Sequence, residues 1–189
     1  MKITFPLLFA CLVSIPVLAD DAKTNSAPDA TAAMASTNSV GVKAVAPVFT
    51  APVTAATVSA PFVLTNGMVS VTEQSDDLSK SGKAVFSFTI ATAGNYLVKA
   101  IVNAPGEDSN SFYVNMDAQP EDPLMIWDME VTSNFEERTV SWRGNGDAGS
   151  DEISPKVFTL TEGPHKLIIL AREAGTELKS VSIVPQAGK

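Results

Sequence analysis

The chain has 189 residues, with 13 basic against 21 acidic side chains and a net charge of -8 at pH 7. An acidic protein is a poor partner for nucleic acid, whose phosphates need Lys and Arg to displace counterions, and for anionic membrane surfaces. Cys11 is the single cysteine, so no disulfide can form within the chain. Hydrophobic burial must hold the fold together, and uncharged or weakly charged ligands remain open.

The N-terminus predicts a secretory signal peptide over residues 1–19. Lys2 precedes an apolar run that closes on Val17-Leu18-Ala19, with small or apolar residues where signal peptidase requires them. The run is short and interrupted by prolines, so no membrane span is expected after cleavage. We therefore expect a secreted or periplasmic protein. The alternative is lipoprotein processing at Cys11.

Residues 20–60 are rich in Ala, Thr, Ser, Val and Pro, and this composition predicts a disordered linker. Proline fixes φ and removes a backbone donor, which favours extended chain over a packed helix. The loosely repeated Ala46-Pro47-Val48 and Ala51-Pro52-Val53 are of this kind. The alternative is that residues 44–53 add an edge strand to the domain that follows, for which we expect the bounds 61–189.

Residues 61–189 alternate apolar and polar side chains with a period of two, which is typical of strands. Ala84, Phe86, Phe88 and Ile90 share one face of a first such segment. No window keeps a helical period for three turns. The same alternation recurs over residues 96–102, 112–117, 139–142 and 157–160.

The C-terminal segment, residues 158–184, predicts three strands joined by the turns Glu162-Gly163-Pro164 and 172–176. Strands at this spacing indicate an all-β sandwich or barrel. We predict a single antiparallel β-sandwich of the jelly-roll type. Residues 167–170 are apolar on both faces, so this strand is either central and covered on both sides or floors a concave groove with its outer face.

The loop over residues 144–149 matches the nucleotide-binding pattern G-x-G-x-x-G, which needs a helix directly after it. A further strand follows instead, so nucleotide binding is excluded. The same loop spaces Asn145, Asp147 and Asp151 so that their oxygens could converge on calcium, the one cofactor we consider. The alternative is a solvated acidic turn.

His165 is the only histidine and begins a strand directly after Gly163-Pro164. We expect it to cap backbone groups, because nothing nearby resembles a nucleophile elbow and catalysis would need a nucleophile and an orienting acid. The protein is therefore predicted not to be an enzyme.

Aromatic side chains are scarce, and three of them are candidates for stacking on the C–H faces of sugars. Tyr113 and Trp127 are the better candidates for an exposed platform. Trp142 continues the alternation of Val140, so core packing competes with sugar binding there.

The sugar's hydroxyls would take hydrogen bonds from polar neighbours, for which Arg172 and Glu173 are candidates. The alternative for these two adjacent residues is a structural ion pair.

Six landmarks follow one another in the domain: Ala93-Gly94-Asn95-Tyr96, Asn110-Ser111-Phe112-Tyr113-Val114-Asn115-Met116-Asp117, Ile126-Trp127, Trp142, Phe158-Thr159-Leu160-Thr161-Glu162-Gly163-Pro164-His165 and Arg172-Glu173-Ala174-Gly175-Thr176. The series resembles bacterial carbohydrate-binding modules of the galactose-binding-like β-sandwich type, related to the family 6 and family 35 modules. The resemblance spans residues 67–184. It departs from the family at Ala174 and Lys179, where aspartates are usual.

Such modules are non-catalytic and hold polysaccharides or cell-surface glycans through loops at one end of the sandwich, often with a structural calcium. The resemblance therefore implies an exported carbohydrate-binding module whose partner is a polysaccharide or glycan. The alternative is a structural or adhesive module of an extracellular or envelope assembly, which uses the fold without a sugar site and contacts other extracellular proteins.

The signal peptide yields a direct prediction. Mature protein recovered from the producing cell should begin at Asp20, because Val17-Leu18-Ala19 forms the cleavage site. N-terminal sequencing and the intact mass measure this. Retention of Met1, or lipid on Cys11, would contradict it.

Overall fold

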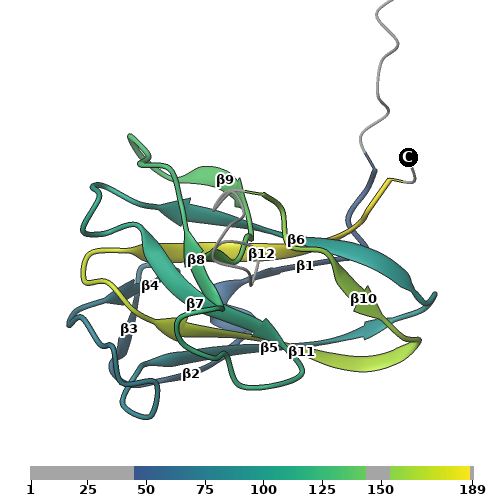
Figure 1. The fold of residues 1–189 in the computed structure, drawn as a ribbon, viewed down its shortest axis with the longest axis horizontal. Helices are drawn as coiled ribbons and strands as arrows, with labels where there is room; N and C mark the ends of the chain where they lie inside the picture. The colour runs from purple at the N-terminus through teal and green to yellow at the C-terminus, as the bar shows by residue number, and fades with distance from the viewer. Residues whose placement is uncertain (1–44, 144–153, 188–189) are drawn as a thin grey trace, which may run out of the picture. The chain divides into compact units, whose positions relative to one another are not determined.

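The computed structural model describes residues 45–143 and 154–187 as two antiparallel β-sheets (Figure 1). The strands of the larger sheet are β1 (Phe49–Pro52), β3 (Phe62–Thr65), β4 (Met68–Val71), β6 (Gly94–Asn103), β9 (Glu136–Thr139), β10 (Phe158–Leu160) and β12 (Glu177–Pro185). Those of the smaller are β2 (Thr57–Ser59), β5 (Lys83–Ile90), β7 (Ser111–Met116), β8 (Ile126–Asp128) and β11 (Gly163–Ala171).

Within the larger sheet the strands run in the order β10-β6-β12-β4-β3, with β1 added to β12 and β9 to β6. The smaller sheet has the order β2-β5-β11-β7-β8. A 3₁₀ turn, η1 (Val53–Ala55), follows β1. No helix in this part of the chain is long and apolar enough to cross a membrane. The predicted antiparallel β-sandwich is thus confirmed.

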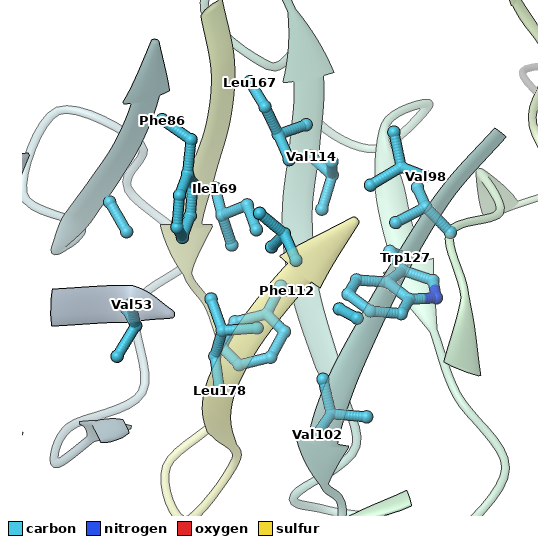
Figure 2. Close-up of a cluster of buried hydrophobic side chains, with 14 of the residues drawn as sticks. Val53, Phe86, Val98, Val102, Phe112, Val114, Trp127, Leu167, Ile169 and Leu178 are labelled. Atoms are coloured by element: carbon cyan, nitrogen blue, oxygen red, sulfur yellow. The ribbon is translucent and has the colours of Figure 1, made fainter. Parts of the chain in front are cut away.

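The core lies between the two sheets and is filled by every second residue of the long strands (Figure 2). Phe86 of β5 and Ile169 of β11 point into it from the smaller sheet, and Val98 of β6 from the larger; all three are buried. Each large apolar side chain removed from water contributes about 1.5–3 kcal/mol. The period of two seen in the sequence is therefore the pattern that builds the core.

Strand β11 lies at the centre of the smaller sheet and is buried on both faces. Leu167 faces the core, whereas Leu170 lies on the outer face in a second cluster with Tyr113 and Ile126. Leu78 and Ile168 pack against that cluster. The sequence left open whether this strand is central with apolar neighbours on both faces or floors a groove. The structure shows the central position.

The predicted boundary of the linker is wrong. Strand β1 pairs with β12, η1 follows it, and β2 pairs with β5, so residues 49–59 contribute to both sheets. Prolines are compatible with this because they occupy an edge strand, where a missing N–H donor costs nothing. The alternative edge strand is thus what the structure shows. The predicted signal peptide and residues 20–44 lie outside the described residues.

Strand β3 and its neighbour β4 form a hairpin closed by the two residues Asn66 and Gly67. Both have positive φ, 51° and 77°, as the tight turns that fit the twist of a hairpin require. Among the described residues β3 pairs with β4 alone, and its Val63 and Leu64 are 43% and 46% exposed. The larger sheet therefore ends in an uncovered apolar edge.

His165 clamps three segments at one end of the sandwich. Its Nδ1 lies 2.7 Å from Oδ2 of Asp117 and its Nε2 2.9 Å from the carbonyl oxygen of Thr161. Since both partners are acceptors, the doubly protonated ring satisfies both bonds. The Asp117 hydrogen bond raises the pKa of His165, against the opposing effect of burial. The prediction that His165 caps backbone groups is confirmed.

The clamp predicts a pH dependence of stability. A folded-state pKa above the unfolded value of 6.5 means that the contribution is complete below pH 6.5 and is lost as pH rises through the folded pKa. The melting temperature should therefore fall over this interval, which no other histidine can explain. Asp117→Asn, an isostere that tolerates the φ of 61° at this position, should flatten the profile. Equal slopes for the two proteins would refute the clamp.

Candidate ligand site at the edge of the sandwich

The predicted exposed platform is wrong, because Tyr113 and Trp127 are buried, with exposed fractions of 0% and 1%. Tyr113 does point away from the main core, but the outer cluster with Ile126 and Leu170 covers it. Trp127 faces inward and packs on Phe112, with the ring centroids 6.1 Å apart (Figure 2). A short strand such as β8 gives too few residues for its phase to be read from sequence.

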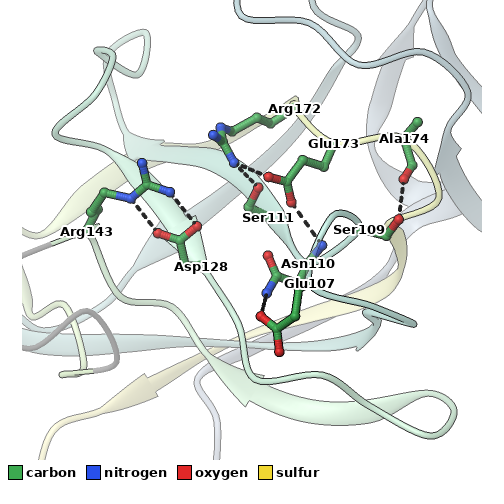
Figure 3. A network of polar contacts seen from close by, with 9 residues as sticks. All are labelled: Glu107, Ser109, Asn110, Ser111, Asp128, Arg143, Arg172, Glu173 and Ala174. Atoms are coloured by element: carbon green, nitrogen blue, oxygen red, sulfur yellow. Dashed lines mark hydrogen bonds and ion pairs between the residues drawn. The ribbon is translucent and has the colours of Figure 1, made fainter.

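Arg172 and Glu173 form the structural ion pair that was the alternative to ligand binding (Figure 3). Nη1 of Arg172 donates to Oε1 of Glu173 and to Oγ of Ser111. The other carboxylate oxygen accepts the backbone N–H of Asn110 at 3.0 Å. The two side chains are 14% and 13% exposed, so the pair holds the turn after β11 against β7 and leaves little for a ligand.

The predicted calcium ligands Asn145, Asp147 and Asp151 lie outside the described residues. Within residues 45–143 and 154–187, no group of three or more His, Cys, Asp or Glu side chains could hold a metal ion.

A cavity opens at the edge of the sandwich, where the edge strands of the two sheets, β8 and β9, approach one another. Its volume is about 300 Å³, at the lower end of the range of ligand pockets. The lining combines the buried edge of one tryptophan with polar side chains and a proline. Its residues are Trp127, Asp128, Met129, Glu130, Arg138, Thr139 and Pro155.

The polar side chains of this cavity are held in defined positions. Arg143 binds Asp128 with two parallel hydrogen bonds, Nε to Oδ2 at 2.7 Å and Nη2 to Oδ1 at 2.9 Å (Figure 3). Nη1 of Arg138 pairs with Glu136 at 3.0 Å, while its Nε is buried without a hydrogen bond to any described residue. The cavity thus offers fixed donors and acceptors, including one donor whose partner is missing.

Trp142 follows Ser141, which forms a bridge with Pro155 of the cavity lining, and is only partly buried. Its Nε1 donates to the carbonyl oxygen of Val114 at 2.8 Å, and Phe158 meets the ring edge-on at 5.9 Å. The next residue, Arg143, contacts Asp128 of the cavity wall. Trp142 packs against the core as its alternation predicted, yet it is also the tryptophan of this chain that retains an accessible surface.

Pro155 and Lys156 complete the edge. Ser141 and Pro155 form an antiparallel bridge, and the N–H of Lys156 donates to the carbonyl oxygen of Val140 at 2.8 Å. Pro155 lines the cavity, and the ammonium of Lys156 lies over the Trp142 ring. We call this group of residues, the cavity lining with Trp142, Arg143 and Lys156, the edge site.

A larger hollow of about 600 Å³ lies at the His165 end. Its lining includes Ser87, Thr89 and Lys166, but its one aromatic ring besides the histidine, Phe88, is 6% exposed. Because stacking needs an accessible ring and Trp142 of the edge site is only partly buried, the edge site is the better candidate for a ligand with apolar faces.

No protein-family model matches the sequence, and no curated protein matches it either. Among solved structures the chain is similar to Arthrobacter globiformis T6 isomalto-dextranase complexed with panose, at 12% identity and a TM-score of 0.50, over 71% of this chain and 22% of that one. It is also similar to the Podospora anserina GH26-CBM35 β-(1,4)-mannanase, at 15% identity and a TM-score of 0.49, over 75% of this chain and 28% of that one.

A third similar structure is a family 35 carbohydrate-binding module from Clostridium thermocellum, at 12% identity and a TM-score of 0.46, over 73% of this chain and 99% of the module. The chain spans less than a third of the two enzymes named above. At these identities the isomalto-dextranase match shows a shared fold and nothing further.

The burial of Trp127 predicts a loss of stability rather than of binding when this ring is removed. Trp127→Ala should lower the free energy of unfolding by about 3–5 kcal/mol, the cost of a large cavity in a packed core. Urea denaturation followed by circular dichroism measures it, with Leu124→Ala, 45% exposed, as the control that changes little. An unchanged unfolding midpoint for Trp127→Ala would contradict the inward placement.

Proposed function

We propose that the protein is an exported, non-catalytic module that binds carbohydrate at the edge site. The observation that carries this proposal is the pairing of a partly accessible tryptophan with a small polar cavity on the same edge of the sandwich. The resemblance of the sequence motifs to carbohydrate-binding modules favours the same function. Export rests on the signal peptide expected over residues 1–19.

The chemistry of the edge site matches that of a sugar. A pyranose presents C–H groups on its faces, which pack on an aromatic ring such as Trp142, and hydroxyls around its rim. Arg138 and Thr139 can donate to those hydroxyls, and Glu130 can accept from them. The volume of about 300 Å³ is small, so the cavity would take one sugar residue rather than a long stretch of polymer.

The same geometry favours binding over hydrolysis. Glycoside hydrolysis uses two carboxyl groups, one of them as a general acid. Of the two carboxylates in the cavity lining, Asp128 has both oxygens engaged by Arg143. Of the cavity lining, this leaves Glu130 as a possible general acid or base, and one carboxyl group cannot fill both roles.

A structural or adhesive module is the second candidate function, and the exposed edge of strand β3 favours it. Natural edge strands are usually protected by charges, prolines or bulges, whereas Val63 and Leu64 are apolar and exposed here. A strand of another protein could extend the sheet at this edge by backbone hydrogen bonds. A module of that kind would require no sugar.

The binding proposal is tested at Trp142. Wild-type protein should retain glycans on an array, and Trp142→Ala should lose about 2 kcal/mol or more of binding free energy, as stacked aromatic residues at binding hot spots do. Trp142→Phe keeps a ring and should retain most of the affinity. Phe135→Ala, a partly exposed ring outside the edge site, is the matched control and should bind normally.

Because Trp142 also packs against the core, a thermal melt of each variant must show that it is folded at the assay temperature. Wild-type protein that retains no glycan would overturn the sugar-binding function and leave the structural module in its place. Equal binding by wild type and folded Trp142→Ala would place the sugar elsewhere.

A further inference from the structure

The accessible ring of the edge site is covered by a cation. Nζ of Lys156 lies over Trp142 at 4.0 Å from the ring centroid. Ammonium groups are attracted to the face of an indole by its quadrupole, and tryptophan is the best aromatic partner for them. The contact is therefore a genuine cation–π interaction and not a chance approach of two side chains.

The Lys156 ammonium has no carboxylate partner among the described residues, so the indole is its main interaction. Burial lowers the pKa of this ammonium, which reflects the loss of water around it. A partly desolvated cation without a counterion recovers hydration when it leaves, so moving the side chain into water costs little. Its long stem allows that movement without any change in the backbone.

The position of Lys156 conflicts with stacking of a ligand on the same ring. Carbon atoms in contact are about 3.5–4.0 Å apart, so a sugar face stacked on Trp142 would occupy the layer in which Nζ now lies. The ammonium and the sugar cannot both be there.

We propose that Lys156 is a reversible cap on Trp142 and determines which ligands gain access to the edge site. This inference rests on the proposed carbohydrate-binding function. A ligand must replace the cation–π contact with its own contact to the ring. Pyranose residues with an unbroken C–H face cover the indole and meet this requirement, whereas residues with a hydroxyl projecting from that face do not.

Three variants test the cap. Lys156→Ala removes it, and Lys156→Arg keeps a cation that stacks on aromatic faces at least as well. Lys179→Ala is the matched control, because Lys179 lies over another ring, Phe135, at 5.5 Å from its centroid and away from the edge site.

The first measurement needs no ligand. Acrylamide quenches the fluorescence of accessible tryptophans, and since Trp127 is 1% exposed, the signal reports mainly on Trp142. Lys156→Ala should be quenched more strongly than the wild type, whereas Lys156→Arg and Lys179→Ala should behave as the wild type does. Unchanged quenching in Lys156→Ala would overturn the cap.

The second measurement is binding of the same proteins to one glycan array. Lys156→Ala should bind about two- to fivefold more tightly, the factor that a solvent-accessible cation–π contact represents, and should accept additional glycans. Lys156→Arg should bind no more tightly than the wild type. Equal or weaker binding by Lys156→Ala would overturn the proposal, and weaker binding would make Lys156 a ligand contact. If none of the proteins binds any glycan, the proposed function fails, and the quenching result alone decides whether Lys156 caps the ring.

Discussion

The burial of strand β11 on both faces is the constraint on which the rest of the structure depends. Its inward side chains join the sandwich core, and on its outer face Leu170 belongs to a second apolar cluster against which Ile168 packs. That second cover takes Tyr113 out of contact with solvent, because this ring stands directly opposite Leu170 in the neighbouring strand. The outer face of the smaller sheet is thus closed around Tyr113, which moves the candidate ligand surface to the edge of the sandwich.

At the edge of the sandwich, the two sheets cover the side chains between them only in part. An edge strand has a neighbour on one side only, so side chains beside it are partly covered. Trp142 bridges this opening by donating a hydrogen bond from the β9 side to the carbonyl of Val114 in β7. One residue therefore both closes the core and leaves a ring in reach of solvent, which is why core packing and ligand contact are not exclusive alternatives for it.

The charged groups of the edge site differ in how far they are paired. Arg172 and Glu173 are adjacent in the sequence and form an ion pair with each other. Asp128 forms an ion pair with Arg143, which comes from another segment. Lys156 of the edge site rests on an aromatic ring, and the Nε of Arg138, like that of Arg172, has no hydrogen bond to a described residue. Groups left incompletely satisfied next to a cavity are where a ligand gains most from binding.

The alternation along β5, β6 and β7 was sufficient to predict the fold class, because a period of two in long strands specifies which side chains must be buried together. The double-sided apolar run of β11 likewise indicated its central position. Strand β1 was foreseen only as an alternative and β2 was missed, because proline-rich composition resembles a linker and the pairing partners lie in later segments of the chain. The place of β1 beside β12 follows from a contact that no local pattern encodes.

The candidate site could be predicted from the sequence less fully than the fold, because it depends more on the tertiary structure. Sequence alone supplied the candidate aromatic residues and the possibility that Arg172 and Glu173 pair with each other. Whether Trp127 or Trp142 faces solvent was decided by the phase of β8 against β7 and by the way β9 closes the sandwich edge, which are relations between distant segments. The position of Lys156 over Trp142 is of the same kind. Composition and periodicity determined that this protein is a β-sandwich, and packing between strands determined which of its side chains a ligand can reach.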